Sequence, residues 1–75
     1  MEKLLAILHE IDPNVDFAHE DDLVESGVLD SLTIVMLVSD LADAFGISIT
    51  PMDIVPENFH SAEAMYAMIT RLQNA

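Results

Sequence analysis

Residues 25–47 read ESGVLDSLTIVMLVSDLADAFGI, and this stretch decides the fold. Asp30 is a good N-cap, because its carboxylate can accept hydrogen bonds from the free N–H groups of a helix's first turn. The apolar residues after it recur at helical spacing, and Gly46 can adopt the left-handed conformation that ends a helix. The stretch therefore predicts a helix between these two residues. Its apolar stripe is formed by Ile34, Leu37, Val38, Leu41 and Phe45.

Two further helices are predicted from the same periodicity. The first lies near the N-terminus and ends before Pro13, because the residue preceding a proline is disfavoured in the helical region. Ser61 is the predicted N-cap of the last helix. Residues 51–59, PMDIVPENF, contain two prolines and can hold only a turn or two of helix. The two outer stripes are Leu4, Ile7, Leu8 and Ile11, and Met65, Met68, Ile69 and Leu72.

Residues 12–30 show no convincing periodicity and are predicted to form a long loop. Four apolar residues are spaced along it and could pin it to the core: Phe17, Leu23, Val28 and Leu29. The expected fold is therefore all-α, a small antiparallel helix bundle of three main helices plus a short helix, with a long first loop.

Length and charge limit the possible functions. We expect residues 1–75 to form one domain without disulfides, because the sequence has no Cys. The sequence has fourteen acidic residues and only two basic ones, Lys3 and Arg71, which gives a formal net charge of −12. Such a surface repels nucleic acid and anionic membranes and attracts a basic protein partner. No apolar run approaches the ~20 residues that span a bilayer, so we expect a cytoplasmic monomer without membrane insertion.

Catalytic and metal sites find little support in the sequence. Ser31 as a nucleophile would need a nearby base, and no motif surrounds any of the three histidines, His9, His19 and His60. Asp12, Asn14 and Asp16 resemble the opening of a calcium loop. However, Phe17 stands at the required glycine and Leu23 at the required glutamate. We therefore predict a turn there and no metal site.

Ser31 lies where a helix start favours negative charge, because the first turn presents free N–H groups and a partial positive charge. Locally, Asp30 and Ser31 could be no more than a cap pair. The predicted helix also carries apolar residues outside its stripe, which either pack on a second neighbour or receive a partner. The apolar residues are Leu32, Val35 and Met36, and the polar residues Ser39, Asp40 and Asp43 follow them outside the stripe.

Residues 27–47, GVLDSLTIVMLVSDLADAFGI, resemble the attachment segment of phosphopantetheine carrier proteins, which include acyl, peptidyl and D-alanyl carriers. The resemblance covers essentially the whole chain. It rests on G-V-L before D-S-L, on F-G-I fourteen to sixteen residues after the serine, and on PENF before the last helix. The resemblance implies that Ser31 carries a 4'-phosphopantetheine arm and that Asp30 caps the helix beside it.

The same resemblance implies partners rather than catalysis by the chain itself. A phosphopantetheinyl transferase would load the arm from coenzyme A. An adenylating ligase, or an acyltransferase or synthase, would then charge it with an acyl or aminoacyl thioester. The surface expected to meet these enzymes consists of Val28, Leu29, Leu32, Val35, Met36, Asp40 and Asp43.

The cargo is left open among several carriers. Fatty-acid carriers typically have G-A-D-S-L and acids along the next helix, whereas Val28 and Leu29 precede Asp30 here, and Thr33 and Met36 stand where acids are expected. The pattern ESGVLDSLTIV is more similar to D-alanyl carriers. Fatty-acid or polyketide carriers are the alternative, and a small acidic helical adaptor that binds a partner helix is the alternative outside this family.

Overall fold

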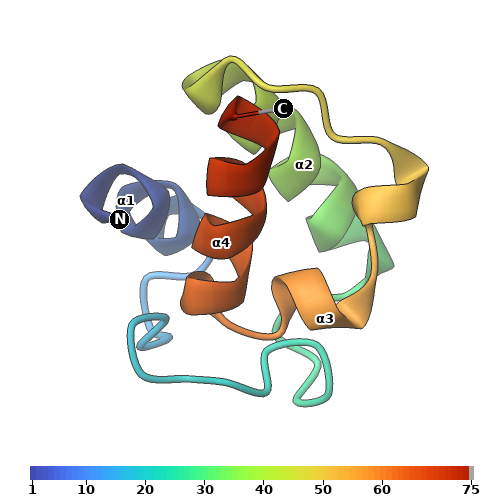
Figure 1. Ribbon diagram of the computed structural model, residues 1–75. Helices are drawn as coiled ribbons and strands as arrows, with labels where there is room; N and C mark the ends of the chain where they lie inside the picture. Colours follow the sequence, from blue (N-terminus) through green and yellow to red (C-terminus); the bar gives the residue numbers. More distant parts are fainter. Residues whose placement is uncertain (75) are drawn as a thin grey trace.

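The fold is all-helical, as predicted. The computed structural model describes residues 1–74, and the chain runs through these helices as a small bundle (Figure 1). Helix α1 packs against α2 and α4, and α3 packs against α4. The helices are α1 (Glu2–Ile11), α2 (Ser31–Phe45), the 3₁₀-helix η1 (Pro51–Asp53), α3 (Pro56–Phe59) and α4 (Ala62–Gln73).

The predicted caps set the helix boundaries. The Thr33 N–H donates to Asp30 Oδ1 at 2.8 Å at the start of α2, and the Ala64 N–H donates to Ser61 Oγ at 3.0 Å at the start of α4. Helix α2 ends at Gly46, which has φ 62° and so occupies the left-handed region. Local side-chain chemistry therefore places both ends of α2 and the start of α4.

The core draws on every α-helix and on the long loop. The core residues are fully or almost fully buried and form one cluster. A chain this short has few residues to bury, so it needs the loop as well as the helices to build a core. Three loop residues enter it, so the loop is anchored as predicted. The buried apolar residues are Leu4, Leu8, Phe17, Leu23, Leu29, Leu37, Leu41, Phe59, Ala62, Met65, Met68 and Ile69.

The start of α1 meets the end of α2. The Lys3 ammonium donates to the Ala44 carbonyl and lies 5.1 Å from the centroid of the Phe45 ring. Phe45 is consequently half-buried at the edge of the core, while Leu37 and Leu41 are the fully buried part of the α2 stripe.

Two hydrogen bonds tie the long loop to the junction between α3 and α4. The Leu23 N–H donates to the His60 carbonyl at 3.0 Å, and the His60 ring Nδ1 bonds to the Asp21 carbonyl at 3.1 Å. The Leu29 N–H then donates to the Leu23 carbonyl at 3.0 Å. Asp30 and Ser31 follow Leu29 directly and begin α2. These hydrogen bonds therefore fix the position of the loop just before Ser31.

Candidate functional site

Ser31 is the first residue of α2 and is exposed. None of the hydrogen bonds among residues 1–74 engages its Oγ. The hydroxyl that the sequence singled out is therefore accessible and uncommitted, at the positive end of a fifteen-residue helix.

Asp30 holds the helix start beside this hydroxyl. Its pKa is lowered from the ordinary value of 3.8, mainly because the Thr33 backbone N–H donates to its carboxylate, with a further contribution from the Thr33 side chain. The carboxylate is turned toward the helix it caps. Asp30 thus serves as the cap that the sequence predicted.

An apolar groove of about 320 Å³ opens next to Ser31. One wall comes from the first turns of α2, and the other comes from α3 and the two residues before it, so the groove lies between segments that are distant in sequence. Apart from Ser31, its lining is Val24, Ile34, Val35, Ile54, Val55, Pro56 and Phe59. A group attached to the serine could lie along apolar side chains here without displacing the core.

The outer face of α2 exposes large apolar side chains. Leu32 is 72% exposed, Val35 63% and Met36 58%. Asp40 and Asp43 are exposed farther along the same helix. Among residues 1–74, no second neighbour buries these apolar side chains, so the helix presents an exposed apolar face next to Ser31.

Leu29 differs from the sequence-based expectation. It is 1% exposed and belongs to the core, so it offers no surface to a partner. Val28 is only half-buried. Adjacency to Ser31 suggested a surface role for both residues. The Leu29 side chain instead packs into the core, and its backbone N–H donates to the Leu23 carbonyl within the loop.

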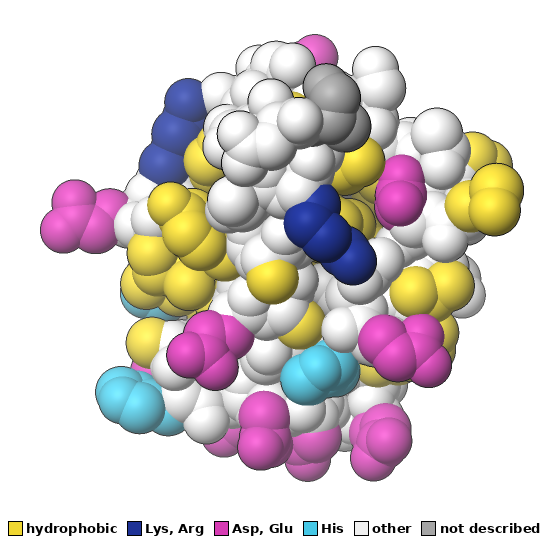
Figure 2. Space-filling view, in the orientation of Figure 1, with side chains coloured by type: hydrophobic (Ala, Val, Ile, Leu, Met, Phe, Trp, Pro, Cys, Tyr) yellow, Lys and Arg dark blue, Asp and Glu magenta, His cyan; other side chains and the backbone are white. Residues whose placement is uncertain are grey.

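Sequence reasoning missed a second exposed apolar site. Met52 in η1 is 88% exposed, and Ile54, just after η1, is 36% exposed. Figure 2 shows hydrophobic side chains gathered on the side of the molecule where η1 lies in Figure 1. No periodicity marks so short a segment. The only available signal was that two large apolar residues stand between prolines.

Acidic side chains gather at the end of the molecule formed by the long loop, along the lower edge of Figure 2. Half of the acids, seven of fourteen, lie in residues 12–30. The neighbouring acids raise the pKa of Glu20 above its ordinary value of 4.5, chiefly through its contact with Asp22 and the charge of Asp22. This end gives the molecule a strong field of one sign.

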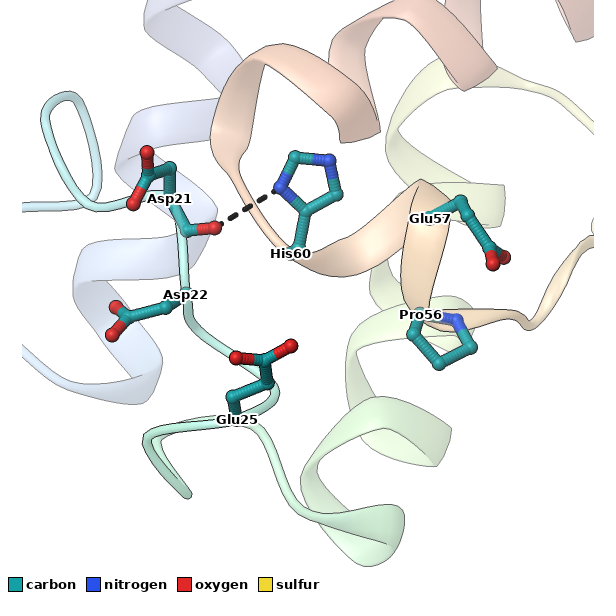
Figure 3. A pocket seen from close by; sticks show the side chains of 6 residues that line it. All are labelled: Asp21, Asp22, Glu25, Pro56, Glu57 and His60. Carbon is teal, nitrogen blue, oxygen red and sulfur yellow. Dashed lines mark hydrogen bonds between the residues drawn. The ribbon is translucent and has the colours of Figure 1, made fainter.

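A pocket of about 290 Å³ at this acidic end is lined by Asp21, Asp22, Glu25, Glu57 and His60, together with Pro56. Figure 3 shows the His60 ring bonded to the Asp21 carbonyl, with the Asp22 and Glu57 carboxylates pointing away from it. The side chains do not converge on a common point. We interpret this pocket as a surface hollow where the long loop joins the junction between α3 and α4, and not as a binding site.

The three histidines are occupied away from Ser31. The His9 ring contacts the Phe17 ring at a tilt of 49°, with the centroids 6.0 Å apart. His19 pairs with Asp16 at 2.8 Å, and His60 holds the loop. None of them lines the groove beside Ser31. Within the described residues, no group of three His, Asp or Glu side chains could hold a metal ion. The Asp12 region forms the predicted turn, in which the Asn14 N–H donates to Asp12 Oδ1 at 3.1 Å.

Across residues 1–74, no helix combines the length and apolar character needed to cross a membrane.

Comparison with known proteins gives a consistent result. The chain matches the family model described as "Phosphopantetheine attachment site" over residues 2–69. It is 34% identical over 71 residues to the D-alanyl carrier protein of Lactococcus lactis subsp. cremoris (strain MG1363), covering 91% of this chain and 89% of that protein. It is also 38% identical over 48 residues to the D-alanyl carrier protein of Lactococcus lactis subsp. lactis (strain IL1403), covering 64% of this chain and 61% of that protein.

Proposed function

This chain belongs to the phosphopantetheine attachment family of carrier proteins, and on that premise we propose that Ser31 is the residue that bears the 4'-phosphopantetheine arm. The observation that carries the proposal is the exposed, unbonded hydroxyl of Ser31 at the first position of α2. An ester-linked phosphate there would lie at the positive end of the helix dipole.

The surroundings of Ser31 fit such a group. The hydroxyl faces solvent, and the groove beside it is lined by apolar side chains rather than by charged residues. In the loading reaction, Ser31 Oγ forms a bond to the phosphorus that coenzyme A presents. The phosphorus–oxygen bond to the adenosine bisphosphate breaks, and the hydroxyl proton passes to a base on the transferase. The attached arm supplies the thiol that this Cys-free chain lacks, on which an acyl or aminoacyl group is held as a thioester.

For the cargo we propose D-alanine or another amino acid, loaded by an adenylating ligase. The support is the name of the relatives, which match most of the chain. The outer face of α2 agrees with this, because it carries Leu32, Val35 and Met36 with few acids. A fatty-acyl or polyketide cargo, charged by an acyltransferase or synthase, is the alternative.

The remaining features of the proposal concern the chain as a whole. We propose that residues 1–75 act as a single domain, as a monomer in the cytoplasm, and that the chain presents cargo without itself catalysing a reaction. Partners would meet the outer face of α2 and its acids Asp40 and Asp43, with the half-buried Val28 at the edge. The tether would keep the cargo at high effective concentration for an enzyme docked there.

The experiment that tests Ser31 is co-expression with a phosphopantetheinyl transferase followed by intact-mass measurement. The wild type should gain the mass of one phosphopantetheine, and Ser31→Ala should gain none. Ser39→Ala is the matched control, because Ser39 is an exposed serine of the same helix and should leave loading intact. Equal loading of Ser31→Ala and the wild type would refute the assignment.

A second candidate function is favoured by the same exposed apolar face. A small acidic adaptor could grip an amphipathic partner helix with Leu32, Val35 and Met36. The adaptor would bind equally well with and without the arm. Affinity for the loaded and unloaded chain therefore distinguishes it from the carrier.

A further inference from the structure

His60, at the junction between α3 and α4, holds the long loop through both its main chain and its side chain. Its carbonyl accepts from the Leu23 N–H at 3.0 Å, and its ring Nδ1 lies 3.1 Å from the Asp21 carbonyl. Among residues 1–74, no other hydrogen bond joins residues 13–29 to α3, α4 or the segment between them. The polar attachment of the loop to this half of the molecule therefore depends on one residue.

The ring of His60 is committed to the loop backbone. A carbonyl oxygen can only accept, so the ring donates to Asp21 from Nδ1. The Asp22 and Glu57 carboxylates point away from the ring and do not compete for this donor (Figure 3). The bond therefore fixes the main chain of the loop itself, whose position does not change when a side chain rotates.

The position of the loop is passed on to Ser31 through Leu23. The Leu23 carbonyl accepts from the Leu29 N–H at 3.0 Å and from the Ser26 hydroxyl at 3.3 Å. Leu23 and Leu29 are 0% and 1% exposed, so both ends of this link are also packed in the core. Two backbone hydrogen bonds thus connect His60 with the residue that lies two positions before Ser31.

Loading of Ser31 requires its hydroxyl to be placed accurately, because a nucleophile must approach phosphorus in a defined geometry. Ser31 is the first residue of α2, so the segment just before it decides how the serine is presented. His60 does not line the groove beside Ser31 and touches none of the reacting atoms. Any effect of His60 on loading must therefore act through the loop.

We infer that the His60 side chain is a positioning residue for the loading of Ser31. By holding the Asp21 carbonyl it keeps the loop ordered up to the start of α2, so that the transferase meets a serine that is already in place. The inference rests on the proposed function and adds to it a residue 29 positions away in the sequence. An ordered loop spares the transferase the entropy cost of ordering it on binding.

Loading kinetics test the inference. His60→Ala should raise the KM of the transferase for the unloaded chain about threefold, with kcat within about twofold, because binding must then also order the loop. His60→Asn should restore the KM, since its amide nitrogen is the same number of bonds from Cα as Nδ1 and can donate to the same carbonyl. An unchanged KM for His60→Ala, or no rescue by His60→Asn, would refute the positioning role.

His19→Ala is the matched control. His19 is also an exposed histidine with a single bond to the loop, 2.8 Å from Asp16, but that bond joins two side chains three residues apart within the loop. Its removal should leave the KM for loading unchanged. An equal rise in KM for His19→Ala and His60→Ala would overturn the inference, because the attachment to the α3–α4 junction would then not be what matters.

Amide hydrogen exchange separates positioning from a general loss of stability. In His60→Ala the protection factors of the Leu23 and Leu29 amides should fall about fivefold, as expected when one hydrogen bond is lost from a local opening equilibrium. The amides of Leu41 and Met68, in the buried parts of α2 and α4, should keep their protection. A parallel fall at all four amides would mean that His60 acts on the whole fold, and would overturn the inference.

Failure of the inference and failure of the proposed function give different results. If Ser31 is not the attachment residue, the wild type gains no phosphopantetheine mass on co-expression with the transferase. If only the role of His60 is wrong, the wild type is loaded and His60→Ala is loaded with the same KM.

Discussion

Helices α2 and α4 use their apolar residues in opposite ways. Helix α4 has twelve residues and buries Ala62, Met65, Met68 and Ile69. Helix α2 has fifteen residues and buries only Leu37 and Leu41. Three large apolar residues of α2, Leu32, Val35 and Met36, lie more than half exposed.

The difference separates stability from recognition. Burial of a large apolar side chain stabilises a fold by roughly 1.5–3 kcal/mol, and α2 forgoes that contribution at three positions near Ser31. Helix α4 therefore acts as the structural helix of the bundle. Helix α2 places the serine and keeps an apolar face available beside it.

The largest expected difference between two variants comes from the same substitution made in both helices. Met65→Ala should destabilise the domain by about 2–5 kcal/mol, because it leaves a cavity in the core. Met36→Ala should change the free energy of unfolding by no more than about 0.5 kcal/mol, since Met36 is exposed. Urea denaturation of both variants checks this. Similar losses for the two would mean that α2 is a structural helix like α4.

A second, smaller effect concerns Phe45, at the C-terminal end of the apolar stripe of α2. Phe45 is half-buried under Lys3, so Phe45→Ala should cost about 2 kcal/mol, less than the ~3–5 kcal/mol of a fully buried phenylalanine. Phe59→Ala, with Phe59 1% exposed, is the control that should reach the larger value. Equal denaturation midpoints for the two variants would show that the end of α2 is as deeply buried as the core.

Removal of the two helix caps should cost less stability than these core substitutions. Asp30→Ala and Ser61→Ala each remove the side-chain acceptor of one helix start and should cost about 1 kcal/mol. Ser61 is 8% exposed and its loss should weaken the whole bundle, whereas loss of the exposed Asp30 should fray the first turn of α2. Loading rates of the two variants, measured beside their melting temperatures, separate these results. A normal loading rate for Asp30→Ala would show that the cap is not needed to place Ser31.

The smallest effect is local and depends on pH. The pKa of Asp30 is lowered below 3.8, so its cap stabilises α2 above that value and is lost as the pH falls through the lowered pKa. The Ser61 cap does not ionise. Amide protection factors should therefore fall at Thr33 in acid and persist at Ala64. Parallel loss at both amides would indicate global unfolding instead.

Local signals made much of this architecture predictable. Asp30, Gly46 and Ser61 act through neighbours three or four residues away, so the sequence shows both partners of each contact. Ser31 was identifiable for a different reason, namely the family motif around it.

Tertiary contacts were harder to predict. Leu29 lies two residues from Ser31, yet its side chain is drawn into the core by packing that involves distant helices. Met52 belongs to a three-residue element in which no period can develop, so its exposure could not be deduced. The groove likewise depends on how α3 and the two residues before it pack opposite α2, which is a tertiary arrangement that local sequence signals do not specify.

The contact between Lys3 and Ala44 has a practical consequence for how this protein can be attached to something else. It holds the first residues of the chain at the end of α2 opposite Ser31 (Figure 1). Fifteen helical residues separate these ends by about 22 Å. A fusion partner or solid support joined at the N-terminus would thus start a full helix length from the serine and leave the surface around it open.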